Sequence, residues 1–257
     1  MFHNLPRLSV AVLGSGPRAL ATAICLSRHH AVALGEAGDY RSRRQLARLP
    51  MYPDEIKLDE FLHRMGRSIK FTDSYQGSLT TADLVVVSAQ PQYRTATRSF
   101  DMAPIERCLD AVRRHRPRAT VVLEAPTPVG YALRASLEHR IMVIPAPWLM
   151  REGHVAIDRA LPRHIVVGSA CERGLNYAFM AVRSSRDHNT PYLLTNASEA
   201  EAIHAFERKR IVRGHSESIE EVVDYCKRQR LDEEQVLRGL QPLAFVRRSK
   251  VQELLSA

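Results

Sequence analysis

Short runs of apolar and β-branched residues alternate with longer mixed segments from residue 8 to about residue 194. Their length and composition are typical of strands. We expect strands at Leu8–Gly14, Ala31–Leu34, Ser68–Phe71, Leu84–Ala89, Thr120–Glu124, Met142–Pro145, His164–Gly168 and Tyr192–Thr195. The intervening segments have helical patterns, most clearly at Arg18–Ser27, Ala103–His115 and Cys171–Ser184. This alternation predicts an α/β, Rossmann-type, doubly wound fold with a mostly parallel sheet, which binds ligands at the carboxyl ends of its strands.

The pattern becomes wholly helical after Asn196. A long helix is predicted from Ala197 to about Arg213, and a second at Ile219–Gln229. A short helix, Glu233–Arg238, is expected to be capped by Asp232 and ended by Gly239, and the tail 241–257 to be partly helical. We therefore predict a dinucleotide-binding domain over residues 1–196 and a central helix with a helical dimerisation region over residues 197–257.

The first predicted strand runs into a glycine-rich loop. Gly14, Gly16 and Ala19 occupy the three fixed places of a G-x-G-x-x-A fingerprint, which gives a tight turn and backbone access to a pyrophosphate. Glu36 ends the second predicted strand, where its carboxylate would accept both ribose hydroxyls of NAD and repel the 2′-phosphate of NADP. The loop predicts NAD binding; the alternative is a loop that only the fold requires.

Basic residues and a proline surround this loop. Pro17 removes one N–H donor from the start of the following helix, although proline is tolerated in a first helical turn. Arg18 and the group Arg41, Arg43 and Arg44 are placed either to reach phosphates or to lie in solvent.

The composition is that of a globular protein. Of 257 residues, 45% are hydrophobic and 25% are charged, which excludes disordered, collagen-like and low-complexity classes. No apolar run is long enough to cross a membrane and Met1–Pro6 does not resemble a signal peptide, so we expect a cytoplasmic protein without a membrane span. Cys25, Cys108, Cys171 and Cys226 lack metal-ligand spacing and are expected to be reduced and mostly buried.

The positive charge is confined to the first region. Residues 1–196 carry 26 Lys+Arg and 17 Asp+Glu, a balance of +9, whereas residues 197–257 carry 11 of each. The surplus either favours a phosphate-bearing ligand or an acidic partner, or it reflects the 32 arginines distributed through nearly every segment. No nucleic-acid-binding motif is visible, and we expect no nucleic-acid partner.

Four further segments resemble the UDP-glucose/GDP-mannose 6-dehydrogenase family, in the family's order. Residues 88–93 and 99–101 (SAQPQY, SFD) are similar to its ATPT strand end and following FD, and residues 126–130 (PTPVG) to its STVPVG turn. Residues 149–153 (LMREG) and 161–168 (LPRHIVVG) resemble FLREG and YPSRIIVG, and residues 194–203 (LTNASEAEAI) resemble FTNSTEAEAIK. The resemblance and the glycine loop together assign these residues to cofactor binding: Gly14, Gly16, Pro17, Arg18, Glu36, Gln90 and Pro91.

The family oxidises a nucleotide sugar twice with NAD, through a thioester on a cysteine, and this chain departs from the residues that do so. The family's threonine falls on Pro126, its acid/base glutamate on Trp148, its lysine on His204 and its helical asparagine on Arg208. The family's cysteine loop and UDP-binding domain would follow Ala257, so we expect a C-terminally truncated member that lacks the catalytic residues. Trp148 is expected either to plug a vacated substrate pocket or to stack on a new ligand. Cys171, near a predicted helix start, is the weak candidate for a reactive thiol.

Three functions remain open at this point. The first is a catalytically degenerate homologue for which NAD(H) is the candidate cofactor, and which serves as a binding or regulatory subunit in nucleotide-sugar or polysaccharide metabolism with a nucleotide sugar or a protein as partner. The second is an active NAD-dependent oxidoreductase that makes a single hydride transfer, with His204 as the candidate for proton exchange. The third is a scaffold protein that no longer binds cofactor, a homodimer through the helices at residues 197–229, which are the family's dimer contact.

Overall fold

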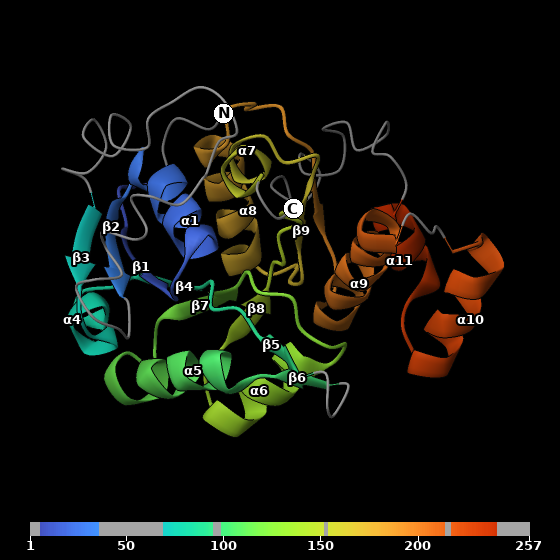
Figure 1. Ribbon diagram of the computed structural model, residues 1–257, viewed down its shortest axis with the longest axis horizontal. Helices are drawn as coiled ribbons and strands as arrows, with labels where there is room; N and C mark the ends of the chain where they lie inside the picture. The colour runs from blue at the N-terminus through green and yellow to red at the C-terminus, as the bar shows by residue number, and fades with distance from the viewer. Residues whose placement is uncertain (1–5, 36–68, 95–98, 152–153, 214–216, 241–257) are drawn as a thin grey trace.

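Six parallel strands form the central sheet, in the order β3-β2-β1-β4-β7-β8 (Figure 1). The computed structural model describes residues 6–35, 69–94, 99–151, 154–213 and 217–240. The strands of the sheet are β1 (Ser9–Leu13), β2 (Ala31–Gly35), β3 (Ile69–Thr72), β4 (Leu84–Val87), β7 (Thr120–Leu123) and β8 (Val143–Pro145). This order reverses at β1 and β4, so their carboxyl ends border the crevice in which such sheets bind ligands.

Two smaller strand pairs accompany this sheet. β9 (Ile165–Val167) pairs in parallel with β10 (Tyr192–Leu194), while β5 (Gln92–Arg94) and β6 (Ser99–Asp101) form an antiparallel hairpin. The N–H of Gly168 donates to the carbonyl of Pro145 at 2.7 Å, which joins the β9–β10 pair to β8. A Cβ at Gly168 would lie 2.7 Å from Pro145 Cγ and 2.9 Å from Ala197 Cα, so this close approach requires glycine.

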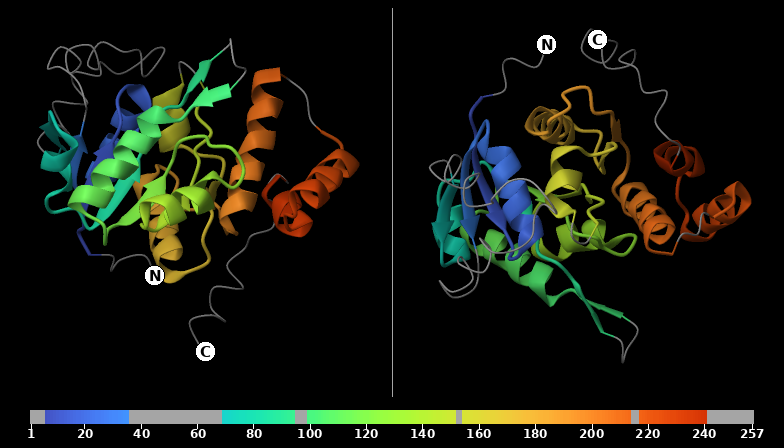
Figure 2. Two further views of the ribbon diagram at one scale, coloured as in Figure 1. Left: turned by 90° about the horizontal axis from the view of Figure 1, so that it is seen from below. Right: turned by 45° about the horizontal axis from the view of Figure 1, so that its top comes forward.

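Helices cover both faces of the sheet, because the strand side chains alternate between two apolar cores. Val10 and Val12 face the core shared with α1 (Pro17–Ser27), α7 (Val155–Ala160) and α8 (Glu172–Ser184). Ala11 and Leu13 face the core shared with α4 (Tyr75–Leu79), α5 (Ala103–His115) and α6 (Tyr131–His139). Figures 1 and 2 show these two helical layers on opposite sides of the strands.

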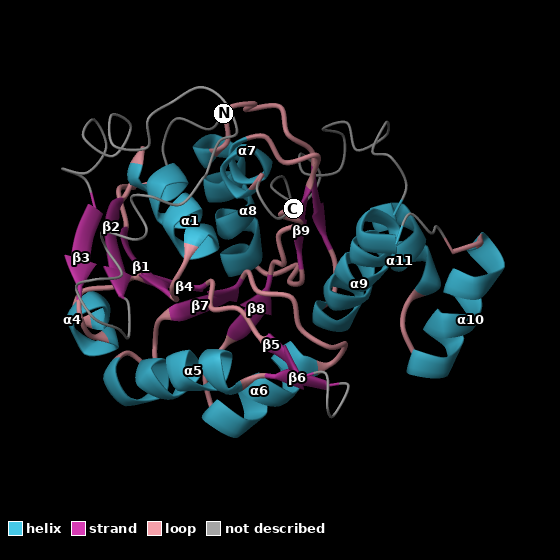
Figure 3. Ribbon diagram, viewed as in Figure 1, coloured by secondary structure: helices cyan, strands magenta, loops and turns pink. Residues whose placement is uncertain are grey.

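A third core joins the C-terminal helices to the edge of the sheet. α9 (Ala197–Arg213), α10 (Ile219–Gln229) and α11 (Glu233–Leu240) bury apolar side chains against Val166 and Leu193 of the β9–β10 pair (Figure 3). The Glu199 carboxylate accepts the N–H of Asp232 at 3.0 Å, which fixes the start of α11 on α9. Within the described ranges, no helix combines the length and apolarity needed to cross a membrane.

The predicted fold is confirmed, since every predicted strand and helix among the described residues is present. The boundaries agree with the prediction to within two residues, but the role predicted for one residue was wrong. Gly239 was expected to end the last helix, but α11 continues through it to Leu240. A Cβ at Gly239 would collide with the side chain of Ile203 on α9, so the glycine permits close helix packing. The predicted helical tail at 241–257 lies outside the described residues.

We therefore expect Gly239→Ala to lower the free energy of unfolding by about 1–3 kcal/mol, the usual cost of overpacking a core. Helix propensity alone would favour alanine, so the expected sign is opposite to that of an exposed helical glycine. Denaturant unfolding measures the effect, and Ile203→Val is the partner variant because it removes Cδ1, the nearest atom. A Gly239→Ala variant as stable as the wild type would show that the two helices do not pack this closely.

Candidate functional site

The carboxyl ends of β1 and β4 bring the glycine loop against residues 88–91. Gly14 has φ +141°, and a Cβ there would lie 2.7 Å from the backbone nitrogen of Ala89, so only glycine allows the two segments to touch. Gly16, with φ +88°, is the N-cap residue of α1, and Pro17 is the first helical residue. A Cβ at Gly16 would meet no atom within 4 Å, so the backbone at the start of α1 faces open space.

The other residues predicted to bind the cofactor or to reach its phosphates do not all lie along the glycine loop. Gln90 and Pro91 are half-buried, and Gln90 Nε2 donates to the carbonyl of Ser88 at 3.3 Å. Arg18 does not extend along the loop, because its guanidinium donates to the carbonyl of Met150 in the segment after β8. Glu36, Arg41, Arg43 and Arg44 lie outside the described residues.

A fully buried ion pair lies behind the carboxyl ends of β7 and β8. Arg159 of α7 places Nη2 3.4 Å from Glu124 Oε1, and both side chains have no exposed surface. Glu124 also accepts hydrogen bonds of 2.5 Å from the hydroxyls of Thr22 and Tyr177. A carboxylate with this many donors is well satisfied, which is the condition for burying a charge.

Trp148 is held by this same group of side chains. The Arg159 guanidinium carbon lies 3.6 Å from the centroid of the Trp148 ring, which is cation–π geometry. The indole N–H donates to the Tyr177 hydroxyl at 3.3 Å, and only 4% of the residue is exposed. Trp148 therefore has a fixed orientation, set by α7 and α8.

His204 of α9 is the neighbour of Trp148 and is 6% exposed. It forms a hydrogen bond with the backbone of Trp148, and the cations Arg18 and Arg208 lie close to it. Burial, reinforced by these two cations, lowers the pKa of His204 to about 3. The imidazole is therefore neutral near pH 7. Arg208 in turn lies over the ring of Phe100 on β6, 5.3 Å from its centroid.

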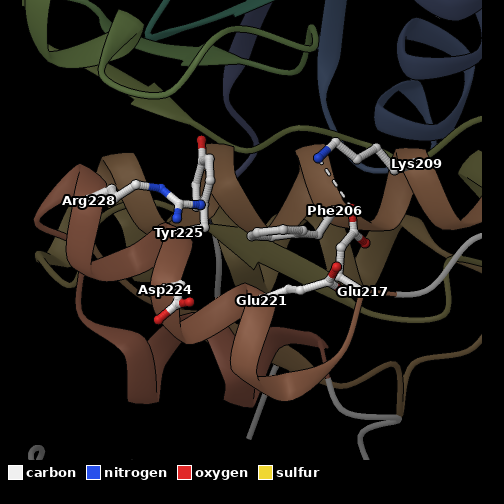
Figure 4. A pocket seen from close by; sticks show the side chains of 7 residues that line it. All are labelled: Phe206, Lys209, Glu217, Glu221, Asp224, Tyr225 and Arg228. Carbon is white, nitrogen blue, oxygen red and sulfur yellow. Dashed lines mark ion pairs between the residues drawn. The ribbon is translucent and has the colours of Figure 1, made fainter.

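A hollow among the C-terminal helices is separate from the side chains around Trp148 and His204. It measures about 440 Å³, and Figure 4 shows its lining side chains, which come from α9, from α10 and from Glu217 shortly before α10. Phe206 and Tyr225 pack edge to face with centroids 5.1 Å apart, and Lys209 over the Phe206 ring already pairs with Glu217 at 3.2 Å. None of the predicted site residues lines it.

Comparisons with known proteins find several nucleotide-sugar dehydrogenases. No protein-family model matches the chain. The UDP-glucose 6-dehydrogenase of Streptococcus pneumoniae is 20% identical over 206 residues, 77% of this chain and 52% of that protein. The UDP-glucose dehydrogenase structure from Pyrobaculum islandicum is 20% identical with a TM-score of 0.62, over 90% of this chain and 59% of its own. The GDP-mannose dehydrogenase of Pseudomonas aeruginosa, solved as a ternary complex, is 16% identical with a TM-score of 0.64. The match covers 92% of this chain and 59% of that one.

The chain is similar in sequence and fold to nucleotide-sugar dehydrogenases. It shares their Rossmann-type fold and spans about half the length of the curated relative that it matches. This confirms the resemblance that the four sequence segments carry.

The structure brings together three of the four positions that the sequence predicts to be substituted. Trp148, His204 and Arg208 lie in one neighbourhood with Arg18, whereas Pro126 lies in the turn after β7. A threonine follows Pro126 directly, but the Thr127 hydroxyl is buried and donates to Glu201 at 2.9 Å. The Thr127 hydroxyl is therefore already engaged within the fold.

Glu201 is a residue that the sequence analysis did not single out. Its carboxylate reaches from α9 to the start of α6 and accepts the backbone N–H groups of Gly130 at 2.6 Å and Ala132 at 2.9 Å. Burial raises its pKa, although these hydrogen bonds oppose the rise. Glu201 thus fixes the turn after β7 through three hydrogen bonds.

The ion pair beneath Trp148 was also missed. The one visible signal was Glu124, a charge at the end of the apolar run TVVL. Arg159 is one of 32 arginines and Tyr177 lies inside an amphipathic helix, so neither stands out in the sequence. Their meeting depends on how α7 and α8 pack over the sheet.

The cysteines follow the prediction in part. Cys25, Cys108 and Cys226 are buried, while Cys171 is exposed at the start of α8. The pKa of Cys171 is lowered, because hydrogen bonds from the Ser169 hydroxyl and the backbone of Gly174 and Arg173 outweigh partial burial. Within the part of the chain that the structure describes, no group of three metal-ligating side chains is present.

Proposed function

We propose that this chain is a catalytically degenerate nucleotide-sugar dehydrogenase homologue that binds NAD(H) and acts as a binding or regulatory subunit in nucleotide-sugar or polysaccharide metabolism, in the cytoplasm. The observation that carries the proposal is the position of Trp148. The family resemblance places an acid/base glutamate there, and this chain instead has an indole fixed by Arg159 and Tyr177. An indole neither accepts nor releases a proton near neutral pH.

The neighbouring groups do not supply the missing proton transfer. Glu124 is the carboxylate of the group that holds Trp148, but it is fully buried and bonded to Thr22, Tyr177 and Arg159. His204 has a pKa of about 3, and an efficient general base has a pKa near the working pH. A neutral His204 also lacks the charge by which the family's lysine would stabilise an oxyanion.

The glycine loop supports the retained cofactor. The start of α1 combines Gly14 in contact with Ala89, Gly16 facing open space, and the first-turn N–H groups of a helix, which together suit a pyrophosphate. Gly14, Gly16, Gln90 and Pro91 would border NAD, and the bound nicotinamide would supply a hydride acceptor.

We expect wild-type protein to give a measurable heat with NAD+ and NADH in calorimetric titrations, and Ser15→Asp to weaken binding by at least about tenfold. Ser15 is exposed in the middle of the loop, so an aspartate there repels the pyrophosphate without disturbing the core. Ser15→Asn is the matched neutral control and should bind like the wild type. Absence of heat and of a thermal shift with wild-type protein at millimolar cofactor would refute the cofactor half of the proposal.

We expect no formation of NADH when the protein is incubated with NAD+ and a panel of UDP-sugars, measured by NADH absorbance. The expected cause is the missing proton acceptor, not a missing cofactor, so the assay uses protein that has passed the titration. Turnover that His204→Ala abolishes would instead establish the alternative, an active single-hydride oxidoreductase.

We also propose a homodimer through α9 and α10, the stretch predicted from residues 197–229. Ile211 on α9 is 37% exposed and Ile219 on α10 is 67% exposed, and an interface would bury both. Light scattering across a dilution series tests the dimer, and a monomer at every concentration would exclude it.

The division of the chain at residue 196 also remains a prediction; it falls between the end of β10 and the start of α9.

A further inference from the structure

A pocket of about 260 Å³ lies beside Trp148, and none of its lining residues belongs to the glycine loop. Three stretches supply most of its wall: residues 147–149 after β8, residues 161–164 between α7 and β9, and one side of α9 within residues 203–211. Pockets for small molecules usually measure roughly 300–1,000 Å³. This one lies just below that range, so its occupant is a compact molecule.

The lining of this pocket is mixed in character. Leu149 is half-buried and Leu161 is 45% exposed, and both line the pocket together with Ile203. Polar and charged side chains form another part of the wall: Arg151, Asp158, Arg163, His164, His204 and Glu207. A ligand that matches both parts has a polar group and an apolar body.

The two lining carboxylates already have partners. The Arg151 guanidinium donates to the Asp158 carboxylate at 2.7 Å, and the Arg151 backbone N–H donates to it at the same distance. Glu207 Oε1 lies 3.3 Å from His164 Nε2 and 3.9 Å from Arg210 Nη2. The negative charges of the wall are therefore compensated, and the pocket has no spare carboxylate for a cationic ligand.

Arg163 is the lining charge without such a partner. It is exposed, and it forms no ion pair in the part of the chain that the structure describes. Because Arg151 compensates Asp158 and Arg210 compensates Glu207, the positive charge of Arg163 is left over. A single guanidinium pairs best with one carboxylate, which it binds through two parallel hydrogen bonds.

We propose that this pocket binds a small molecule that carries one carboxylate on a compact apolar body. Arg163 pairs with the carboxylate, while Leu149 and Leu161 contact the body. The ion pair sets the orientation of the ligand, and burial of its apolar surface supplies most of the affinity. This site goes beyond the proposed cofactor binding and does not depend on it, because the pocket and the glycine loop share no lining residue.

Three probes separate the charge from the apolar body: cyclohexanecarboxylate, the neutral cyclohexanecarboxamide, and acetate. In calorimetric titrations of the full-length chain without NAD, at constant ionic strength, the first should bind with a Kd of about 1 mM or tighter. The other two should bind at least about fivefold more weakly, because each lacks one of the two interactions. No heat with cyclohexanecarboxylate, or equal affinity for the acid and the amide, would overturn the proposal.

Trp148 reports where the probe binds, because it is the single tryptophan of the chain and lines the pocket. Its fluorescence should change along the same binding curve as the heat. Heat from cyclohexanecarboxylate without any change in Trp148 emission would place the probe elsewhere and contradict the assignment.

Arg163→Gln should weaken cyclohexanecarboxylate at least about fivefold and leave cyclohexanecarboxamide unchanged. Arg228→Gln is the matched control, since it removes the same charge from an exposed arginine on α10 that does not line this pocket. The control should bind like the wild type. An equal loss in both variants would mean attraction by net charge only, and no loss in Arg163→Gln would mean that Arg163 does not bind the carboxylate; either result refutes the proposal. Neither result bears on the NAD titrations of the Ser15 variants.

Discussion

Arg159→Met should destabilise the protein by about 3–5 kcal/mol, the usual cost of removing one partner of a buried ion pair. Arg159 and Glu124 have no exposed side-chain surface, so solvent cannot replace the lost cation. The same change removes the guanidinium stacked on Trp148. Denaturant unfolding followed by circular dichroism measures the loss, while Trp148 fluorescence reports separately on whether the indole has moved.

The double variant Arg159→Met with Glu124→Gln is the control for this prediction. It removes both charges and keeps a side-chain oxygen at position 124 that accepts a hydrogen bond from the hydroxyl of Thr22 or Tyr177. It should recover most of the lost stability, since replacing a whole buried pair is often nearly neutral. A single variant that loses less than about 1 kcal/mol would mean that the pair is not desolvated as described.

The second large effect is expected from acid. His204 and His30 are buried, at 6% and 1% exposure, and burial lowers the pKa of His204 to about 3 and that of His30 to about 4. Nearby cations reinforce both shifts: Arg18 and Arg208 at His204, and Arg183 and Arg7 at His30, beside His29. In the unfolded chain both imidazoles titrate near pH 6.5.

The sign of the effect follows from these values. Between pH 6.5 and 4 the unfolded chain holds more protons on these histidines than the folded one, so the free energy of unfolding decreases as the pH falls. Each histidine contributes about 1.4 kcal/mol per pH unit, or about 3 kcal/mol per unit for both. The stability that they provide is complete above pH 6.5, and its loss ends near pH 4 for His30 and near pH 3 for His204.

Glutamine variants isolate this contribution from that of the carboxylates. The slope of unfolding free energy against pH should decrease by about 1.4 kcal/mol per unit in His204→Gln and by as much in His30→Gln. The comparison is between slopes, so a uniform loss of stability in either variant does not affect it. Parallel curves for wild type and both variants would contradict the buried, neutral state of these histidines.

The sequence and the structure contribute different information about the four positions predicted to be substituted. The sequence alone located Pro126, Trp148, His204 and Arg208 as departures from the family pattern, and it left Trp148 with two interpretations. The contacts with Arg159 and Tyr177 favour the interpretation of a fixed side chain that fills its site, because one face of the indole and its N–H are already engaged.

The α/β fold, its strands and helices, and the glycine loop were predictable from the sequence. Those features depend on local patterns: the period of apolar residues, and glycines where the backbone turns or touches a neighbour. The environment of individual polar groups, by contrast, depends on the three-dimensional packing. The pairing of Glu124 with Arg159, the neutral state of His204 and the role of Gly239 in helix packing all arise between residues distant in the chain. Desolvation and contact are properties of the packed molecule, and no local pattern encodes them.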